Sequence, residues 1–467
     1  MKSALGALLL GGLLAAAGAA RAQQEPELDR IPSAPAATPA GLPLTAATSR
    51  IESKIYLQAD GVLAAARGDL FVPLPGPPPS DWEARAFLDA RVTASLSGQV
   101  SLVYSGRFNL RAEEGLDFPS HQSVRHDLRE AYIAWEDGQG SFVDLGRINL
   151  KSGVALGFNP TDFFKTRAVV EPVSSDPSVL REDRLGALML RAQHLFQGAT
   201  LTVAFAPKLY GRTKIYGNAD LPTVNPMFDR TNADNRLLLK ASLALPGDLS
   251  PEVLVLFHDG APRFGLNLTR GLGQKVIAYV EWAGGDRRSL VAEALAYGRE
   301  TGAIPAFAPS PFAVSDKAGF RSDATAGFSY TTTSKITFNL EYQLHQAGFS
   351  AADWRGWFAA APRPGFADAE RWYIRSYAGD QQEPIARQAL FLRADRQDAF
   401  VRNLELSGFV SADLRDGSAL GQVSADYFLS RRWTVGLLAS ASEGRRRSDF
   451  GVLPSDGSVV VRLSRYF

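Results

Sequence analysis

Runs of about ten residues with strictly alternating apolar and polar side chains constrain the fold of this chain more than any other feature. In residues 336–345, one set of alternate positions holds Ile336, Phe338, Leu340, Tyr342 and Leu344. The other set holds Thr337, Asn339, Glu341, Gln343 and His345. A two-residue period places the two sets on opposite faces of a β-strand, whereas a helix repeats near 3.6 residues. Residues 83–96 repeat the design, so the sequence predicts strands with one apolar and one polar face.

Segments of this kind recur from residue 50 to the end of the chain. They predict strands near 51–64, 83–97, 99–111, 125–137, 141–151, 185–196, 199–209, 236–245, 251–258, 263–271, 275–284, 323–333, 335–346, 384–394, 400–413, 419–430, 432–443 and 458–467. The patterns at 51–64 and 384–394 are the weakest. We therefore expect about 18 strands, with 16 as the alternative, and an even number is what single-chain bacterial barrels have.

The predicted connections alternate between short and long. Tight turns at 97–99, 137–140 and 197–198 alternate with long stretches such as 152–183, 210–234, 286–320 and 347–382. Short turns at one end and long loops at the other are typical of outer-membrane barrels, whereas a soluble β-sandwich mixes loop lengths at both ends. The expected fold is an all-β, transmembrane antiparallel β-barrel over residues 50–467.

The N-terminus has the features of an export signal. Lys2 precedes an apolar run from Ala4 to Ala20, and Ala20-Arg21-Ala22 fits a small-x-small cleavage site. Residues 1–22 are therefore expected to be a signal peptide, and the Pro- and Ala-rich residues 23–49 a disordered periplasmic lead-in. After residue 22, charges interrupt every apolar run before it reaches the ~20 residues of a spanning helix.

The last predicted strand resembles the signal by which outer-membrane proteins are passed to their assembly machinery. Val459, Val461 and Leu463 alternate with polar residues, and the chain stops at an aromatic residue, Phe467. Arg465 departs from this signal, because an apolar residue is usual two places before the end. The expected location is the Gram-negative outer membrane, with the barrel-assembly machinery and membrane lipid as partners.

Composition excludes several other classes of function. The chain has no cysteine, so it is not a small disulfide-linked extracellular module. A formal net charge of +1 offers no basic surface for nucleic acid. The five histidines are scattered, so we expect no metal site, no cofactor and no catalytic function.

A barrel of 16–18 strands leaves an aqueous channel unless loops block it. The inward faces of the predicted strands carry charges of both signs, and the lumen-lining candidates are Arg85, Asp89, Arg91, Arg107, Arg111, Lys240 and Glu341. Most of the 50 basic residues are arginine, which holds carboxylates and other planar anions through two hydrogen bonds. Such a lining would favour small hydrophilic, anionic or sugar-like solutes. Alternatively, the charges pair with one another and brace the wall.

The long stretch 152–183 is a candidate for folding inward and narrowing the channel. It combines glycines, the run Phe158-Asn159-Pro160-Thr161-Asp162 and a cluster of charges. The constriction candidates in and beside it are Lys151, Asp162, Lys165, Arg167, Arg181, Glu182, Asp183 and Arg184. A long loop with both apolar and charged residues suits this role, although packing on the outer surface is an equal alternative.

These motifs resemble those of a known group of proteins. Gly146-Arg147 followed by Gly153 and then Phe-Asn-Pro-Thr-Asp, together with the segments 414–418 and 431–433, is similar to a broad group of porin-like outer-membrane barrels. That group is related in architecture to the alginate-export barrels. The resemblance spans most of residues 125–467, rests on short motifs and implies a passive or substrate-selective channel, without implying a solute.

Two other functions remain open on the sequence. A narrow or plugged barrel could act as an adhesin or structural protein through its outer loops. The aromatic residues of 353–377, including Trp354 and Trp357, could form a binding surface, but such residues more often form the interfacial girdle of a barrel. An outer-membrane lipid hydrolase would need a His and a Ser two residues apart, and His121 and Ser123 have this spacing in a predicted loop.

Overall fold

The computed structural model describes residues 51–467 except 77–78, 117–119, 121–122, 170–173, 216–223, 307–309, 313–316 and 360–364. The expected signal peptide and lead-in therefore lie outside the described residues. The chain forms an 18-stranded antiparallel barrel in which each strand pairs with the next, as expected. The strands are β1 (Ile51–Ala66), β2 (Trp82–Ser95), β3 (Val100–Glu113), β4 (Val124–Glu136), β5 (Ser141–Ile148), β6 (Ala187–Phe196), β7 (Ala199–Ala206), β8 (Arg236–Leu243), β9 (Leu249–His258), β10 (Ala261–Leu272), β11 (Val276–Arg287), β12 (Gly319–Thr331), β13 (Ile336–His345), β14 (Gln388–Arg396), β15 (Leu404–Asp413), β16 (Ala419–Phe428), β17 (Trp433–Glu443) and β18 (Ser455–Tyr466).

The barrel closes where the first strand meets the last. β1 pairs with β18 in a register that places Tyr56 opposite Tyr466, and the amide of Phe467 donates to the carbonyl of Ile55 over 3.0 Å. Closure leaves no strand edge unpaired among the described strands, which a barrel surrounded by lipid requires. The two segments with the weakest alternation, at 51–64 and 384–394, both correspond to strands of the barrel.

The alternation read from the sequence places side chains on the two faces of the wall as expected. In β13, Leu340 is 37% exposed on the outer face, whereas the neighbouring Glu341 is fully buried inside. A band of outward apolar side chains and an inward polar face are what a membrane barrel needs. The strand expected at 400–413 begins later, at Leu404, because Asp398, Phe400 and Asn403 have positive φ angles that end a strand.

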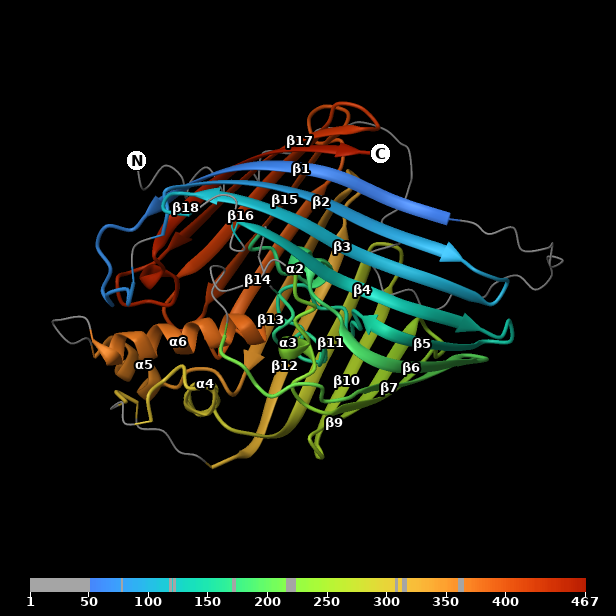
Figure 1. The fold of residues 1–467 in the computed structure, drawn as a ribbon, viewed down its shortest axis with the longest axis horizontal. Helices are drawn as coiled ribbons and strands as arrows, with labels where there is room; N and C mark the ends of the chain where they lie inside the picture. The colour runs from blue at the N-terminus through green and yellow to red at the C-terminus, as the bar shows by residue number, and fades with distance from the viewer. Residues whose placement is uncertain are drawn as a thin grey trace.

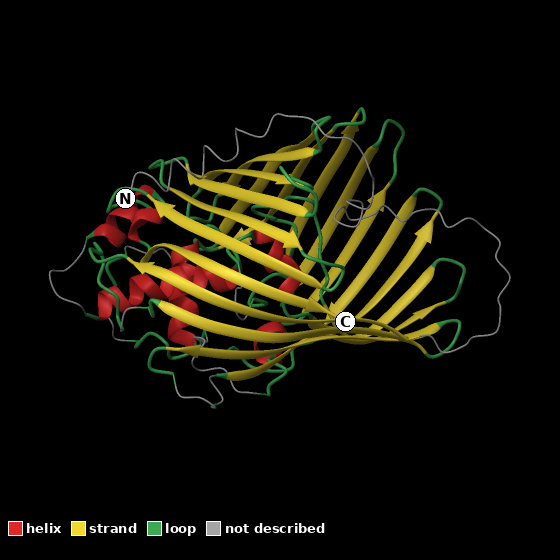
Figure 2. Cartoon of the chain, turned by 90° about the horizontal axis from the view of Figure 1, so that it is seen from above, coloured by secondary structure: helices red, strands yellow, loops and turns green. Residues whose placement is uncertain are grey.

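The two ends of the barrel differ in their connections. At the short-turn end, tight turns join successive strands, whereas the other end carries long connections such as 149–186, 207–235, 288–318 and 346–387. Helices α2 (Pro177–Asp183) and α3 (Phe228–Thr231) lie within the ring of strands, and α4 (Leu290–Glu300), α5 (Ala351–Phe358) and α6 (Phe366–Gln381) gather at one end (Figures 1 and 2). No helix in the described ranges is long and apolar enough to cross a membrane.

The three helices of the long-loop end form a cap with its own hydrophobic core. Trp354 and Trp357 of α5 are 3% and 0% exposed, and they pack with Phe349, Ile374 and residues of α4. The expectation that the aromatics of 353–377 form an interfacial girdle is therefore wrong for these tryptophans. Their positions follow a helical period rather than a strand period, so their side chains point into the cap instead of toward lipid.

Candidate functional site

The connection 149–186 between β5 and β6 crosses the interior of the barrel. Its residues 154–157 reach Glu281 of β11 and Glu341 of β13, which lie six and eight strands from β5 in a ring of 18. Glu281 accepts hydrogen bonds from the amides of Val154 and Ala155, the latter over 2.6 Å. Half the ring is nine strands, so the loop is attached to the wall almost opposite its starting point.

Glu341 completes this attachment. Its carboxylate accepts hydrogen bonds from the amides of Leu156 and Gly157 over 2.6 and 2.9 Å, and from the hydroxyl of Tyr279 over 2.8 Å. The backbone of Gly157 lies in close contact with the wall, and a side chain at this position would not fit, since its Cβ would lie 2.5 Å from Cγ of Phe391. Two carboxylates thus hold four consecutive amides, and we call Glu281 and Glu341 the carboxylate latch.

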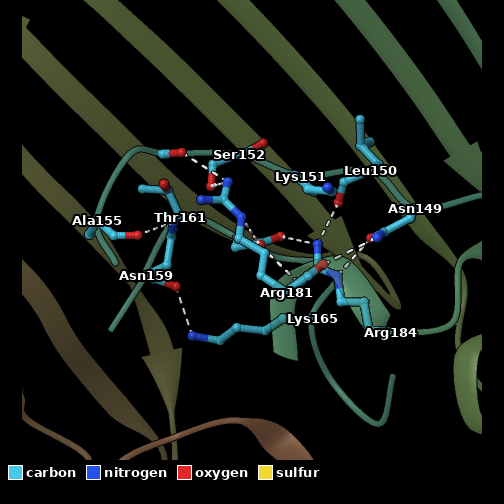
Figure 3. Close-up of polar contacts among 12 residues, drawn as sticks. Asn149, Leu150, Lys151, Ser152, Ala155, Asn159, Thr161, Lys165, Arg181 and Arg184 are labelled. Carbon is cyan, nitrogen blue, oxygen red and sulfur yellow. Dashed lines mark hydrogen bonds and ion pairs between the residues drawn. The ribbon is translucent and has the colours of Figure 1, made fainter. Parts of the chain in front are cut away.

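Within the loop, a buried ion cluster fixes the chain on itself (Figure 3). Arg184 makes two hydrogen bonds to Asp162, over 2.8 and 3.0 Å, and Arg181 lies 3.5 Å from the same carboxylate. Burial opposes ionisation of Asp162, but the two guanidinium groups hold its pKa below the ordinary value. Arg181 also donates to the carbonyls of Ser152 and Gly153, each over 2.9 Å.

The loop is tied to two further parts of the wall. Asp183, at the end of α2, contacts Arg107 of β3 and Arg129 of β4, each over 3.0 Å. On the other side, Asp176, the N-cap residue of α2, pairs with Arg393 of β14. The loop therefore spans the interior between β3–β4 and β14 as well as reaching β11 and β13.

The cap and the connection 207–235 are joined to the same loop. Asp380 of α6 accepts hydrogen bonds from Arg167 over 3.1 Å and from Arg230 over 2.6 Å. Arg147, which is 1% exposed on β5, donates to the carbonyl of Gly186 over 2.8 Å and also to that of Pro226. Three long connections are thus linked through buried guanidinium groups.

A cavity of about 330 Å³ lies between loop 149–186, α6 and the wall formed by β13–β16. One part of its surface is apolar and includes Phe158, Phe391 and Phe409, of which the last two stack with ring centroids 5.6 Å apart. Charged groups complete the lining, namely Asp162, Lys165, Arg181, Arg184, Arg375, Glu383, Asp413 and Asp449. This cavity is the candidate functional site.

Lys165 is the basic residue of the cavity with the fewest compensating contacts. Its ammonium donates to the carbonyl of Asn159 over 2.7 Å and lies 4.4 Å from the centroid of the Phe158 ring. Within the described part of the chain it forms no ion pair with a carboxylate. Burial lowers the pKa of Lys165 to about 8, against the opposing effect of Glu383 and Asp162.

The lumen-lining candidates of β2 and β3 form ion pairs on the inner face. Arg107 contacts Asp89 over 2.9 Å, and Arg85 contacts Glu83 over 2.6 Å. Arg111 lies 2.7 Å from the same Glu83. The pairing favours the bracing interpretation for these arginines over that of free anion-binding groups.

The other wall candidates differ in their surroundings. Arg91 is half-exposed and lies 3.1 Å from Glu130, and Lys240 lies 3.5 Å from Glu252. Glu341 belongs to the carboxylate latch. Among the constriction candidates, Lys151 and Glu182 pair with each other at an exposed position, away from the cavity lining.

The residues of the alternative functions are not assembled into sites in the described structure. His121 lies outside the described residues, and the buried hydroxyl of Ser123 donates to the carbonyl of Ser120 over 3.1 Å.

Asp234, His258 and Asp259 bring three ligand atoms within 4.8 Å of one another, which sequence spacing did not indicate. Arg212 lies 3.1 Å from Asp234, and Arg212 and His258 together hold the pKa of this carboxyl below its ordinary value against the effect of burial. The guanidinium of Arg212 therefore already supplies a positive charge to this cluster.

Sequence reasoning missed the latch residue Glu281 and the cavity residues Asp413 and Asp449. Glu281 had a usable signal, because it shares the inward face of a predicted strand with Tyr279 and Ala283, two residues away on either side. Asp413 and Asp449 had none, because the end of β15 and the connection between β17 and β18 meet only through the pairing of these neighbouring strands.

The comparisons with known proteins concern the fold. No family model and no curated protein matches the sequence. Among solved structures, the chain is similar to Acinetobacter baumannii OccAB1, with a TM-score of 0.52 and 9% identity over 89% of this chain and 96% of that one. For A. baumannii OccAB4, the TM-score is 0.50 and the sequence identity is 8%, and the match covers 89% of this chain and 98% of that one. For a mutant of the Rh. blastica porin, the TM-score is 0.41 and the sequence identity is 11%, and the match covers 90% of this chain and 100% of that one. At these identities the likeness to the two Acinetobacter structures establishes the fold alone, a closed antiparallel β-barrel.

Proposed function

We propose that this protein is an outer-membrane channel for small hydrophilic solutes. The observation that carries the proposal is a charged cavity inside an 18-stranded barrel, between the wall and a loop held across the interior. A barrel of this size has room for an aqueous path, and a loop inside it sets the width of that path. The porin-type fold of the similar structures is consistent with this function and with outer-membrane localisation.

We further propose a preference for anions at the narrowest part. Lys165, Arg181 and Arg184 lie on the loop side of the cavity, where Asp162 is the only acidic residue that the described part of the loop contributes to the lining. The two arginines share the charge of Asp162, and Lys165 has no carboxylate within ion-pair distance among the described residues. The net positive charge of this side would attract anionic groups and repel cations.

The test is conductance of the purified, detergent-folded full chain in a planar bilayer. We expect stepwise openings and a reversal potential in a salt gradient that reports anion preference. Lys165→Met should reduce that preference, whereas Lys54→Met should leave it unchanged, because Lys54 lies near the beginning of β1 and does not line the cavity.

A second candidate is a plugged barrel that acts through its outer loops. It is favoured by the helical cap α4–α6 and by the linked connections inside the barrel. If protein that is shown to be folded conducts no current, this result would support the plugged barrel and contradict the channel.

A further inference from the structure

The cavity has a second charged region, at the end of β15. Asp413 is 1% exposed and lines the cavity, and its Oδ2 accepts no hydrogen bond from the described residues. Its nearest cation is Arg415, whose Nη2 lies 3.5 Å from that oxygen. The guanidinium of Arg415 is also placed over the Trp354 ring, 4.0 Å from its centroid, so it is engaged by the cap.

A second buried carboxylate lies in the same region. Asp449 also lines the cavity, and its Oδ1 forms an ion pair with Nη1 of Arg375 over 2.9 Å. Burial raises the pKa of Asp449, against the effect of Arg375. Asp416 adds a third negative charge, since the amide of Asp449 donates to its carboxylate over 2.9 Å. Three carboxylates face two guanidinium groups here, which leaves an excess of negative charge.

The acidic and basic regions lie at separate places along the cavity. Arg375, which contacts Asp449, and Gln382, which donates to the carbonyl of Lys165, are both contributed by α6 and its C-cap. Seven residues separate them, which corresponds to about 10 Å along a helix at 1.5 Å per residue. The same cavity also has an apolar surface that includes the stacked rings of Phe391 and Phe409.

We infer that the cavity binds zwitterionic solutes in which an ammonium group and a carboxylate are separated by an apolar span. The carboxylate would accept hydrogen bonds from Lys165 and Arg181, and the ammonium would donate to Asp413 and Asp449. A ring or short carbon chain between them would lie against Phe391. This inference rests on the proposed channel function and names its solute class. A purely anionic solute would leave the buried carboxylates without a partner.

The inference is tested by current block with three probes of similar size. These are 4-(aminomethyl)benzoate, benzoate and benzylamine, added to the full chain conducting potassium chloride in a planar bilayer. We expect the zwitterion to block half of the current at a concentration about tenfold lower than either singly charged probe, because it gains one more charge-assisted contact. Equal block by benzoate would overturn the inference.

Separate variants test the acidic and the basic region of the cavity. Asp413→Asn should abolish the advantage of the zwitterion over benzoate, and Lys165→Met should abolish its advantage over benzylamine. Glu113→Gln is the matched control, because Glu113 is an acidic residue of β3 that pairs with Arg111 outside the cavity lining. Asp449→Asn repeats the test if Asp413→Asn does not fold, and an unchanged probe order in both aspartate variants would contradict the assignment.

Failure of the channel and failure of the solute class give different results. If the folded protein conducts no current, calorimetric titration of the three probes into detergent-folded protein replaces current block. Preferential binding of the zwitterion, lost in Asp413→Asn, would then support the site in a plugged barrel. Conductance without preference for the zwitterion would support the channel and refute the site.

Discussion

Removing the carboxylate latch should release the loop that crosses the barrel. Glu281 and Glu341 together accept four amide hydrogen bonds from residues 154–157, and both side chains are fully buried. The perturbation is the double variant Glu281→Ala/Glu341→Ala. It removes the acceptors while leaving the outward faces of β11 and β13 unchanged.

The magnitude follows from the hydrogen bonds that are lost. A hydrogen bond to a charged group contributes about 1.5–3 kcal/mol, so four would give on the order of 6–12 kcal/mol. Two effects lower this value: the freed amides can bond to water in the interior, and two buried carboxylates no longer have to be desolvated. We therefore expect the attached state of the loop to be destabilised by about 3–5 kcal/mol. The ion pairs of Asp183 with Arg107 and Arg129 would remain, so the loop would detach from one side of the wall only.

The assay combines thiol labelling with single-channel recording. The chain has no cysteine, so Ala155→Cys introduces a unique probe in the latched segment, at a position that is 1% exposed. In the latched background we expect slow labelling of this thiol, and in the double variant labelling faster by a factor of about 100 or more, since ~3 kcal/mol is roughly two decades. Conductance should change in parallel, with larger or noisier openings.

Glu113→Ala is the control for loss of an inward carboxylate, because Glu113 does not contact the loop. Labelling in this control should match that of the latched background. If the thiol introduced by Ala155→Cys were labelled equally fast with and without the latch, in protein that is folded in both cases, the reasoning about the four amides would be refuted.

Two further predictions follow from the faces of the wall and from the cavity. Leu340→Arg places a charge on the lipid-facing side of β13 and should reduce the stability of the inserted barrel by about 2–4 kcal/mol, measured by reversible unfolding in lipid, and equal loss in Asn339→Ala, on the inward side of the same strand, would contradict the assignment of the faces. Because the pKa of Lys165 is lowered to about 8, its charge is present below that pH and lost above it, so anion preference should decline as pH rises through about 8. Reversal potentials recorded from about pH 6.5 to about 9.5 test this, and the same decline in Lys165→Met would assign it to another group.

The wall could be predicted from the sequence because its information is local. A strand that faces lipid on one side and water on the other must alternate, and that period is visible within ten residues, as in 336–345. The same pattern assigned Glu341 to the inside and Leu340 to the outside, as the structure has them. The predicted 400–413 strand was too long because Phe400, whose residue type rarely adopts positive φ, carries no sequence signal for this conformation.

The site was less predictable because its contacts join distant parts of the chain. Asp183 and Arg107 are 76 residues apart, and Asp176 and Arg393 are 217 apart, so nothing in the spacing links them. The composition of 152–183 indicated an unusual loop but left its position open between the interior and the outer surface. The tryptophans of α5 show a different failure, because a helical segment of the cap was interpreted as if it belonged to the strands of the barrel wall.

The internal pairing of charges bears on how such a channel can select a solute. Most wall arginines, such as Arg107 with Asp89, already have a carboxylate partner, so a passing ion gains little by replacing it. Selection therefore falls to the few buried groups whose pairing is incomplete, Lys165 on one side of the cavity and Asp413 on the other. A solute that binds both groups gives each buried charge a partner, whereas a simple ion pairs with one group and leaves the other buried without a partner. On this reasoning, substituting the wall arginines in pairs with their carboxylates should alter conductance far more than it alters which solute is preferred.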